Sequence, residues 1–183
     1  MNERTPLLIL GLGNVLLEDD GVGSAAVRTL LDRYVPPEDV HVLDGGTLGL
    51  SLLPYVDAAD AVILVDAVKA DAAPGTCVRL DGEDVAPAVA TRLSPHQIGV
   101  ADLLDGARWL DRSPRRLTLV GIVPESMELA VGLTPRVHDA LLDLVEQIVG
   151  TARELGFHFR PRLAHEMADD TGAVDVARLA GMR

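Results

Sequence analysis

Hydrophobic residues along the chain fall into short continuous runs and into groups spaced three or four positions apart. The continuous runs predict buried strands, and the spaced groups predict helices with one apolar face. The expected strands are 7–10, 40–43, 61–65, 76–80 and 117–123. The expected helices are 23–34, 48–56, 98–110 and 135–155. The stretch 82–93 has little periodicity and predicts a loop with at most a helical turn.

Strands and helices follow one another mainly as strand–helix–strand. This order predicts an α/β fold of three layers, a sandwich in which helices flank a mainly parallel sheet of five strands. Residues 1–159 are expected to form a single α/β domain. Residues 160–183 are rich in charged and small residues and match no strand, so we expect a mobile C-terminal tail.

Composition limits the class of protein and its compartment. The chain has 183 residues, of which 48% are hydrophobic and only 3% aromatic, so one domain with an aliphatic core is expected. Its formal net charge of -12 argues against nucleic acid and anionic membranes as partners. Its single cysteine, Cys77, cannot form an internal disulfide, which favours a reducing compartment. With no signal-peptide pattern and no membrane-length apolar run, we expect a cytoplasmic location and no membrane insertion.

A glycine-rich turn, Gly11–Asn14, follows the first predicted strand. It fails as a dinucleotide-binding fingerprint because Leu16 stands where the third glycine belongs. Glu18, Asp19 and Asp20 come where the next helix begins, and they would repel a pyrophosphate there. Helix capping accounts for one acidic residue. The excess of acidic residues indicates a site for a cation or a cationic group.

Two further candidate ligands are expected near the same edge of the sheet. Asp66 directly follows the apolar strand 61–65, and open parallel sheets bind ligands beyond the carboxyl ends of their strands. Asp66 either caps the next turn or meets Asp20 at this edge, where two carboxylates repel unless they share a cation or a proton. His96 lies in an irregular stretch before a predicted helix. It is either a capping or surface histidine, or a ligand carried by a loop that folds over the edge.

Two carboxylates and one imidazole form a borderline set of metal ligands. Imidazole suits zinc, copper, iron and nickel, whereas an all-oxygen set would suit calcium or magnesium. Three protein ligands leave positions open for substrate or water. The sequence has no HExxH and no GxSxG motif, and Cys77 lies within a predicted strand, where core packing is its expected role.

Six short motifs stand in order along the chain. They are GLGN at 11–14 with DDGVG at 19–23, LDGGT at 43–47 followed by Gly49, VDA at 65–67, SPHQ at 94–97, GIVPES at 121–126 and GLTP at 132–135. In order and in spacing they resemble the motifs of the hydrogenase maturation endopeptidases. The resemblance covers about residues 7–156 and is specific because six motifs occur together.

The resemblance implies a twisted five-stranded sheet flanked by helices, and a peptidase activity. Family members remove a short C-terminal extension from the precursor of the nickel–iron hydrogenase large subunit, after its nickel–iron centre has been installed. In the family an acidic residue of the first motif, the Asp after the third strand and the loop histidine bind metal, which implies Asp20, Asp66 and His96 here. Asp44 is implied near the site, where it positions substrate or assists hydrolysis.

The expected protein is therefore an endopeptidase whose catalytic residues include Asp20, Asp66 and Asp44. It recognises nickel carried by its substrate and needs no tightly bound cofactor of its own. The attacking water is activated either by a metal or by a carboxylate base. Two other functions stay open, a self-contained metallohydrolase and a nickel-dependent checkpoint that never cuts. Nucleotide binding is disfavoured by Leu16 and by the acidic run.

Overall fold

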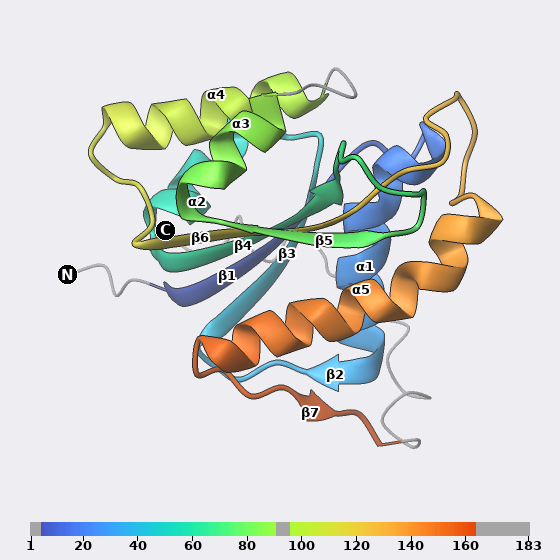
Figure 1. Ribbon diagram of the computed structural model, residues 1–183. Coiled ribbons are helices and arrows are strands. Elements are labelled where there is room, and N and C mark those ends of the chain that lie inside the picture. The colour runs from blue at the N-terminus through green and yellow to red at the C-terminus, as the bar shows by residue number, and fades with distance from the viewer. Residues whose placement is uncertain (1–4, 91–95, 164–183) are drawn as a thin grey trace.

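The computed structural model describes residues 5–90 and 96–163, and a five-stranded sheet forms its middle layer (Figure 1). The strand order is β3-β1-β4-β6-β5; the first four of these run parallel, and β5 is antiparallel to β6 at one edge. The strands are β1 (Thr5–Leu12), β3 (Val40–Gly46), β4 (Ala59–Ala67), β5 (Cys77–Asp81) and β6 (Arg116–Ile122). The predicted α/β fold with a mainly parallel five-stranded sheet is confirmed.

Helices cover both faces of the sheet, so the molecule has three layers (Figure 1). One apolar core lies between the sheet and helices α1 and α5, and the other lies between the sheet and helices α2, α3 and α4. Neighbouring residues of a strand enter opposite cores: Leu7 and Ile9 of β1 face the first, and Leu8 and Leu10 face the second. Because both faces are buried, the central strands read as continuous apolar runs.

Most helices lie where periodicity predicted them, with two differences. The predicted helix 48–56 is a short 3-10 helix followed by a short α-helix, and the predicted loop 82–93 contains a 3-10 turn and helix α3. The helical elements are η1 (Glu18–Gly21), α1 (Val22–Arg33), η2 (Gly49–Leu52), α2 (Leu53–Asp57), η3 (Gly82–Asp84), α3 (Val85–Ala90), α4 (His96–Trp109) and α5 (Pro135–Glu154). None of the helices in the described part of the chain has the length and apolarity needed to span a bilayer.

Helix α5 shows how local sequence sets the ends of an element. Pro135 opens its first turn, where a missing N–H costs nothing, and Thr134 caps it by accepting a 3.5 Å hydrogen bond from the Val137 N–H. Gly156 follows the end of the helix with φ +97°, a conformation that glycine adopts without strain. Both ends agree with the prediction from the sequence.

The fold continues beyond the predicted domain boundary at residue 159. Strand β7 (Arg160–Pro161) pairs antiparallel with β2 (Tyr34–Val35), and the Arg162 N–H donates to the Arg33 carbonyl at 2.7 Å. The expectation of no strand after 159 was therefore wrong, since a two-residue strand is too short to show a period. Residues 164–183 of the expected tail lie outside the described residues.

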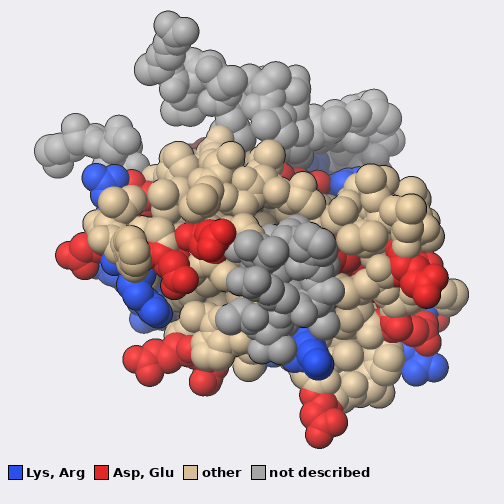
Figure 2. Space-filling model, turned by 90° about the horizontal axis from the view of Figure 1, so that it is seen from above, with Lys and Arg blue, Asp and Glu red and all other residues tan. Residues whose placement is uncertain are grey.

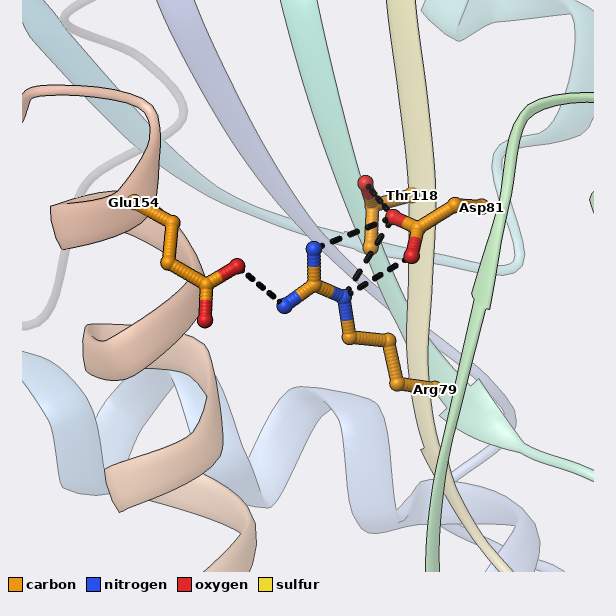
Figure 3. A network of polar contacts seen from close by, with 4 residues as sticks. All are labelled: Arg79, Asp81, Thr118 and Glu154. Carbon is orange, nitrogen blue, oxygen red and sulfur yellow. Dashed lines mark hydrogen bonds and ion pairs between the residues drawn. The ribbon is translucent and has the colours of Figure 1, made fainter.

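A polar network ties the antiparallel edge of the sheet to α5 (Figure 3). Arg79 of β5 contacts Asp81 on its own strand and Glu154 at the end of α5, with a closest distance of 2.6 Å to Glu154. Thr118 of β6 donates a 2.7 Å hydrogen bond to Asp81. The hydrogen bond to Glu154, together with Asp81, raises the pKa of the Arg79 guanidinium, so Arg79 keeps its positive charge between the two carboxylates.

Candidate active site

The two aspartates predicted as ligands lie at the carboxyl ends of neighbouring strands. Strands β1 and β4 pair in parallel, with Gly11 opposite Val65. Asp20 follows β1 in η1, and Asp66 lies one residue past Val65 in β4. The condition set by the sequence, that these two strands are neighbours, is therefore met. Asp66 is part of the strand, which extends to Ala67, rather than the first residue after it.

Asp20 is held in place by a tight turn after β1. Gly13 has φ +124°, and a Cβ there would lie 1.7 Å from the carbonyl oxygen of Asp20, so only glycine fits this approach. The Asp20 side chain is fully buried, and its Oδ2 accepts a 3.0 Å hydrogen bond from the Asn14 N–H. The GLGN motif therefore shapes the backbone around a buried carboxylate instead of a phosphate.

Asp66 is buried at the end of β4, with 2% of its surface exposed. Its Oδ1 accepts a 2.8 Å hydrogen bond from the Ala67 N–H. The first turn of α1 comes close to the same place, because a Cβ on Gly23 would lie 2.2 Å from the carbonyl oxygens of both Leu12 and Val65. Helix α1 thus rests on the ends of β1 and β4, and brings the preceding η1 with Asp20 to the edge where Asp66 lies.

Asp19, next to Asp20, holds a distant loop against η1. Its Oδ2 accepts hydrogen bonds from the Glu125 N–H at 2.8 Å and the Ser126 N–H at 3.1 Å, and its two oxygens accept from the Thr134 N–H at 2.8 Å and hydroxyl at 2.9 Å. The side chain is fully buried. Helix capping, the alternative weighed for this residue, does not occur, since neither η1 nor α1 has a side-chain cap.

No local pattern in the sequence indicated this role of Asp19, because its partners lie more than one hundred residues further along the chain. Thr134, which accepts from the first turn of α5, also donates to Asp19. The motifs GIVPES and GLTP contain these partners. Their occurrence together with the DDGVG motif is the one sequence feature that could have indicated a contact between the two regions.

Asp44 lies at the same edge of the sheet, in β3 opposite Gly11. Its Oδ1 accepts a 2.6 Å hydrogen bond from the Ser24 hydroxyl, and its Oδ2 accepts from Arg28 at 3.2 and 3.3 Å. Both partners belong to α1. Asp44 therefore helps to seat α1 on the sheet, and its expected role toward substrate stays a prediction.

His96 is the first residue of α4, and its side chain lies outside the described residues. The start of α4 nevertheless lies beside the segment that leaves the carboxyl end of β3, since a Cβ on Gly49 would be 3.2 Å from the Cα of Gly99. Among the described residues, no group of three or more His, Cys, Asp and Glu forms a metal site. The role of His96 as a third ligand stays a prediction.

Cys77, which the sequence assigned to core packing, lies in β5 and packs against the core beneath α1 and α5. Burial, and to a smaller extent the charge of Asp143, raises the pKa of its thiol above the ordinary value. A thiol with a raised pKa is a poor nucleophile near neutral pH. Cys77 is therefore a poor candidate for a catalytic nucleophile.

Buried carboxylates at one edge favour the approach of a cation. Burying a carboxylate costs free energy unless donors or positive charge compensate it. Asp19 receives four hydrogen bonds from uncharged groups, and η1 and β4 bring Asp20 and Asp66 to a common edge of the sheet. Oxygen ligands at such an edge can bind a divalent metal or orient a water molecule for hydrolysis.

Comparison with known proteins identifies the family. A family model described as hydrogenase maturation protease matches residues 25–151. The chain is 42% identical over 159 residues to the hydrogenase 2 maturation protease of Escherichia coli, covering 86% of this chain and 97% of that protein. Among solved structures, it resembles the hydrogenase maturating endopeptidase HybD from E. coli, with a TM-score of 0.81 at 42% identity over 86% and 98% of the two chains. It also resembles the [NiFe] hydrogenase maturation protease HybD from Thermococcus kodakarensis, with a TM-score of 0.65 at 28% identity over 80% and 99%. The chain belongs to the hydrogenase maturation protease family.

Proposed function

We propose that this protein is a cytoplasmic endopeptidase that removes the C-terminal extension of a nickel–iron hydrogenase large-subunit precursor after nickel has been inserted. The main support is the placement of two buried carboxylates, Asp20 and Asp66, at the carboxyl ends of adjacent strands in a member of this protease family. This edge is where open parallel sheets bind their ligands.

In this proposal Asp20, Asp66 and His96 contact nickel that is already bound to the precursor. Nickel accepts imidazole and carboxylate ligands, and three ligands leave the metal free to keep bonds to the substrate. Contact with the metal explains why a loaded precursor is cut and an empty one is spared. The three ligands must bind only moderately tightly, because otherwise the enzyme would remove the metal from its product.

The experiment compares nickel-loaded and nickel-free precursor incubated with the purified protein. Mass spectrometry of the large subunit should show loss of the C-terminal extension only from the loaded form. An intact loaded precursor that stays bound to the protein would favour the nickel-dependent checkpoint. Equal cleavage of both forms, together with a stoichiometric metal in the isolated protein, would favour a self-contained metallohydrolase.

Replacement of His96 tests the least supported ligand. We expect His96→Ala to lower cleavage of the loaded precursor by about a hundredfold or more, because the loss of one ligand weakens the contact with the metal. The thermal unfolding temperature should stay unchanged. His138→Ala, in an exposed position on α5, is the matched control and should cleave normally. Normal cleavage by His96→Ala would remove this residue from the site.

A further inference from the structure

Two segments beside the candidate active site expose large apolar side chains. The turn after β1 exposes Val15 and Leu16, and the loop between β6 and α5 exposes Leu129 and Val131, which are 83% and 82% accessible. We call these four residues the apolar rim. Apolar side chains gathered in one exposed place mark a binding surface more often than an accident of folding.

The two segments of the apolar rim are joined to one another. Leu17 and Ala130 form a parallel β-bridge, and the Glu18 N–H donates to the Ala130 carbonyl at 2.9 Å. The bridging residues are direct neighbours of Leu16 and Leu129 in the chain. The exposed side chains of the turn and of the loop therefore belong to one surface.

Each segment of the apolar rim is anchored by one of the two buried aspartates. Asp20 accepts from the Asn14 N–H, and the Asn14 side chain in turn accepts a 3.0 Å hydrogen bond from the Leu16 N–H. Asp19 fixes the other segment through its hydrogen bonds to residues 125, 126 and 134. Because these anchors are fully buried, the rim is a pre-formed surface at the mouth of the site, which lowers the entropic cost of binding.

The charge around the apolar rim limits what it can bind. Glu18 and Glu128 stand beside its residues, Glu125 begins the same loop, and the chain as a whole has a net charge of -12. Arg136 lies 3.6 Å from Glu125 and offsets one of these charges. Seen from above, the molecule carries acidic side chains, and some basic ones, around a mostly uncharged face (Figure 2). An acidic polypeptide would be repelled, whereas an apolar segment with a basic residue would be attracted.

We propose that the apolar rim binds an apolar, basic stretch of the precursor polypeptide next to the bond that is cut. This inference rests on the proposed function, since it takes the precursor as the occupant. Binding at the rim adds affinity for the polypeptide that does not depend on the nickel contacts, and it positions the chain across the edge that carries Asp20 and Asp66.

The test separates substrate binding from the cleavage step. The double variant Leu129→Ser, Val131→Ser removes the two most exposed side chains of the rim and leaves the hydrogen-bonding groups of the loop backbone in place. Steady-state cleavage of nickel-loaded precursor should show a rise in KM of about tenfold or more, as expected for the loss of apolar anchors at an interface. The turnover number should stay within about twofold of the wild type, because a group that binds ground state and transition state equally affects KM alone.

Trp109→Ser is the matched control for loss of an exposed apolar side chain. Trp109 is 91% accessible and ends α4. The segment after it contacts the start of β4 through the Arg115 N–H and the Asp60 carbonyl, at the opposite edge of the sheet. This variant should keep the wild-type KM. Thermal unfolding of both variants at the wild-type temperature excludes a folding defect, which exposed positions are not expected to cause.

Charge gives a second, independent readout. Glu128→Gln should raise KM by about twofold to tenfold at low salt, with a smaller effect at high salt, because attraction between exposed charges is screened. If the wild-type protein cleaves the precursor and the double variant has an unchanged KM, the proposed binding at the rim is wrong and the proposed function stands. Failure of the wild-type protein to cleave or bind loaded precursor would overturn both.

Discussion

Carboxylates serve two different purposes in this molecule, at the carboxyl-end edge of the sheet and around helix α5. At the sheet edge Asp19 and Asp20 are fully buried, and uncharged N–H and O–H groups donate to Asp19. Around α5 the exposed Glu154 is paired with Arg79 in the network of Figure 3. One region keeps negative charge inside the protein, and the other compensates it at the surface.

The difference shows which carboxylates the protein can lose. An exposed ion pair is screened by water and salt, so removing it changes the free energy of unfolding little. Removing a buried carboxylate has a larger effect, either on the free energy of unfolding or on the binding of a ligand. Asp19 holds the loop at 125–134 and so serves the fold, whereas the neighbouring Asp20 lies at the same edge of the sheet as Asp66 and is proposed to serve a ligand. Single substitutions should separate the two roles.

Asp20→Asn should have the largest effect, and on activity. The amide keeps an oxygen that can accept from the Asn14 N–H but lacks the negative charge that attracts a cation. We expect cleavage of nickel-loaded precursor to fall by about a hundredfold or more, measured by mass spectrometry of the large subunit over time. The unfolding temperature should stay the same or rise, because a buried charge has been removed.

Retained cleavage by Asp20→Asn would return this residue to a structural role and remove the functional contrast with Asp19. Loss of cleavage together with a large fall in the unfolding temperature would lead to the same conclusion. Glu18→Gln is the matched control, because Glu18 carries the same charge at the start of the same 3-10 helix but is only partly buried. It should keep its turnover number and its unfolding temperature, since loss of a charge beside the rim is expected to change KM alone.

Asp19→Ala should have the largest effect on stability. It removes a fully buried carboxylate and leaves the partly buried N–H groups of Glu125, Ser126 and Thr134 without their acceptor. An unpaired donor costs about 1–3 kcal/mol when it is buried and less where water reaches it, so we expect the free energy of unfolding to fall by about 2–3 kcal/mol. Urea unfolding followed by circular dichroism measures it. A change below about 1 kcal/mol would mean that other acceptors or water replace the carboxylate.

Much of the fold could be predicted because the central strands are apolar on both faces. Leu7–Leu10 and Ala61–Val65 read as continuous apolar runs, and such runs alternating with helical periods indicate a parallel sheet. The strand order and the antiparallel direction of β5 could not be predicted, since periodicity carries no information on which strands pair. The two-residue strand β7 and the short helix α3 were not predicted, because they contain too few residues to show a period.

Of the candidate site, the sequence predicts only those residues that follow a recognisable strand. Asp66 follows an apolar run, and Asp20 follows a glycine-rich turn, so topology alone sends both to one edge. The role of Asp19 depends on donors in a loop more than one hundred residues away, which no local pattern contains. The contact of Asp44 with Arg28 and Ser24 likewise depends on how α1 packs on the sheet.

Arg79→Met tests the other side of the comparison and should have a small effect. The substitution keeps the apolar part of the side chain and removes its contacts with Asp81 and Glu154. Exposed ion pairs contribute at most about 1 kcal/mol, so we expect a loss of that size or less in urea unfolding. The loss should shrink further at high salt. A loss above about 2 kcal/mol would show that this network is as important to the fold as the buried aspartate.

The smallest expected effect concerns Tyr34, whose hydroxyl donates to Glu146 of α5. That hydrogen bond, followed by burial and the negative charge of Glu146, raises the pKa of Tyr34 above its ordinary value of about 10. The folded state therefore holds the phenol proton more tightly than the unfolded state does. The resulting stabilisation is complete below about pH 10 and is lost as the pH rises through the higher pKa of the folded state.

Tyr34→Phe should thus differ from the wild type in how stability depends on pH. Between pH 8 and about pH 11 the wild type should lose more unfolding free energy than the variant, by less than about 1 kcal/mol because the contact is exposed. Urea unfolding at both pH values measures the difference. Glu146→Ala should flatten the pH dependence in the same way, because it removes both the acceptor and its charge. If the unfolding free energy depends on pH equally in the wild type and in both variants, Glu146 does not hold the phenol proton. The contact of Tyr34 with α5 would then be one of packing alone.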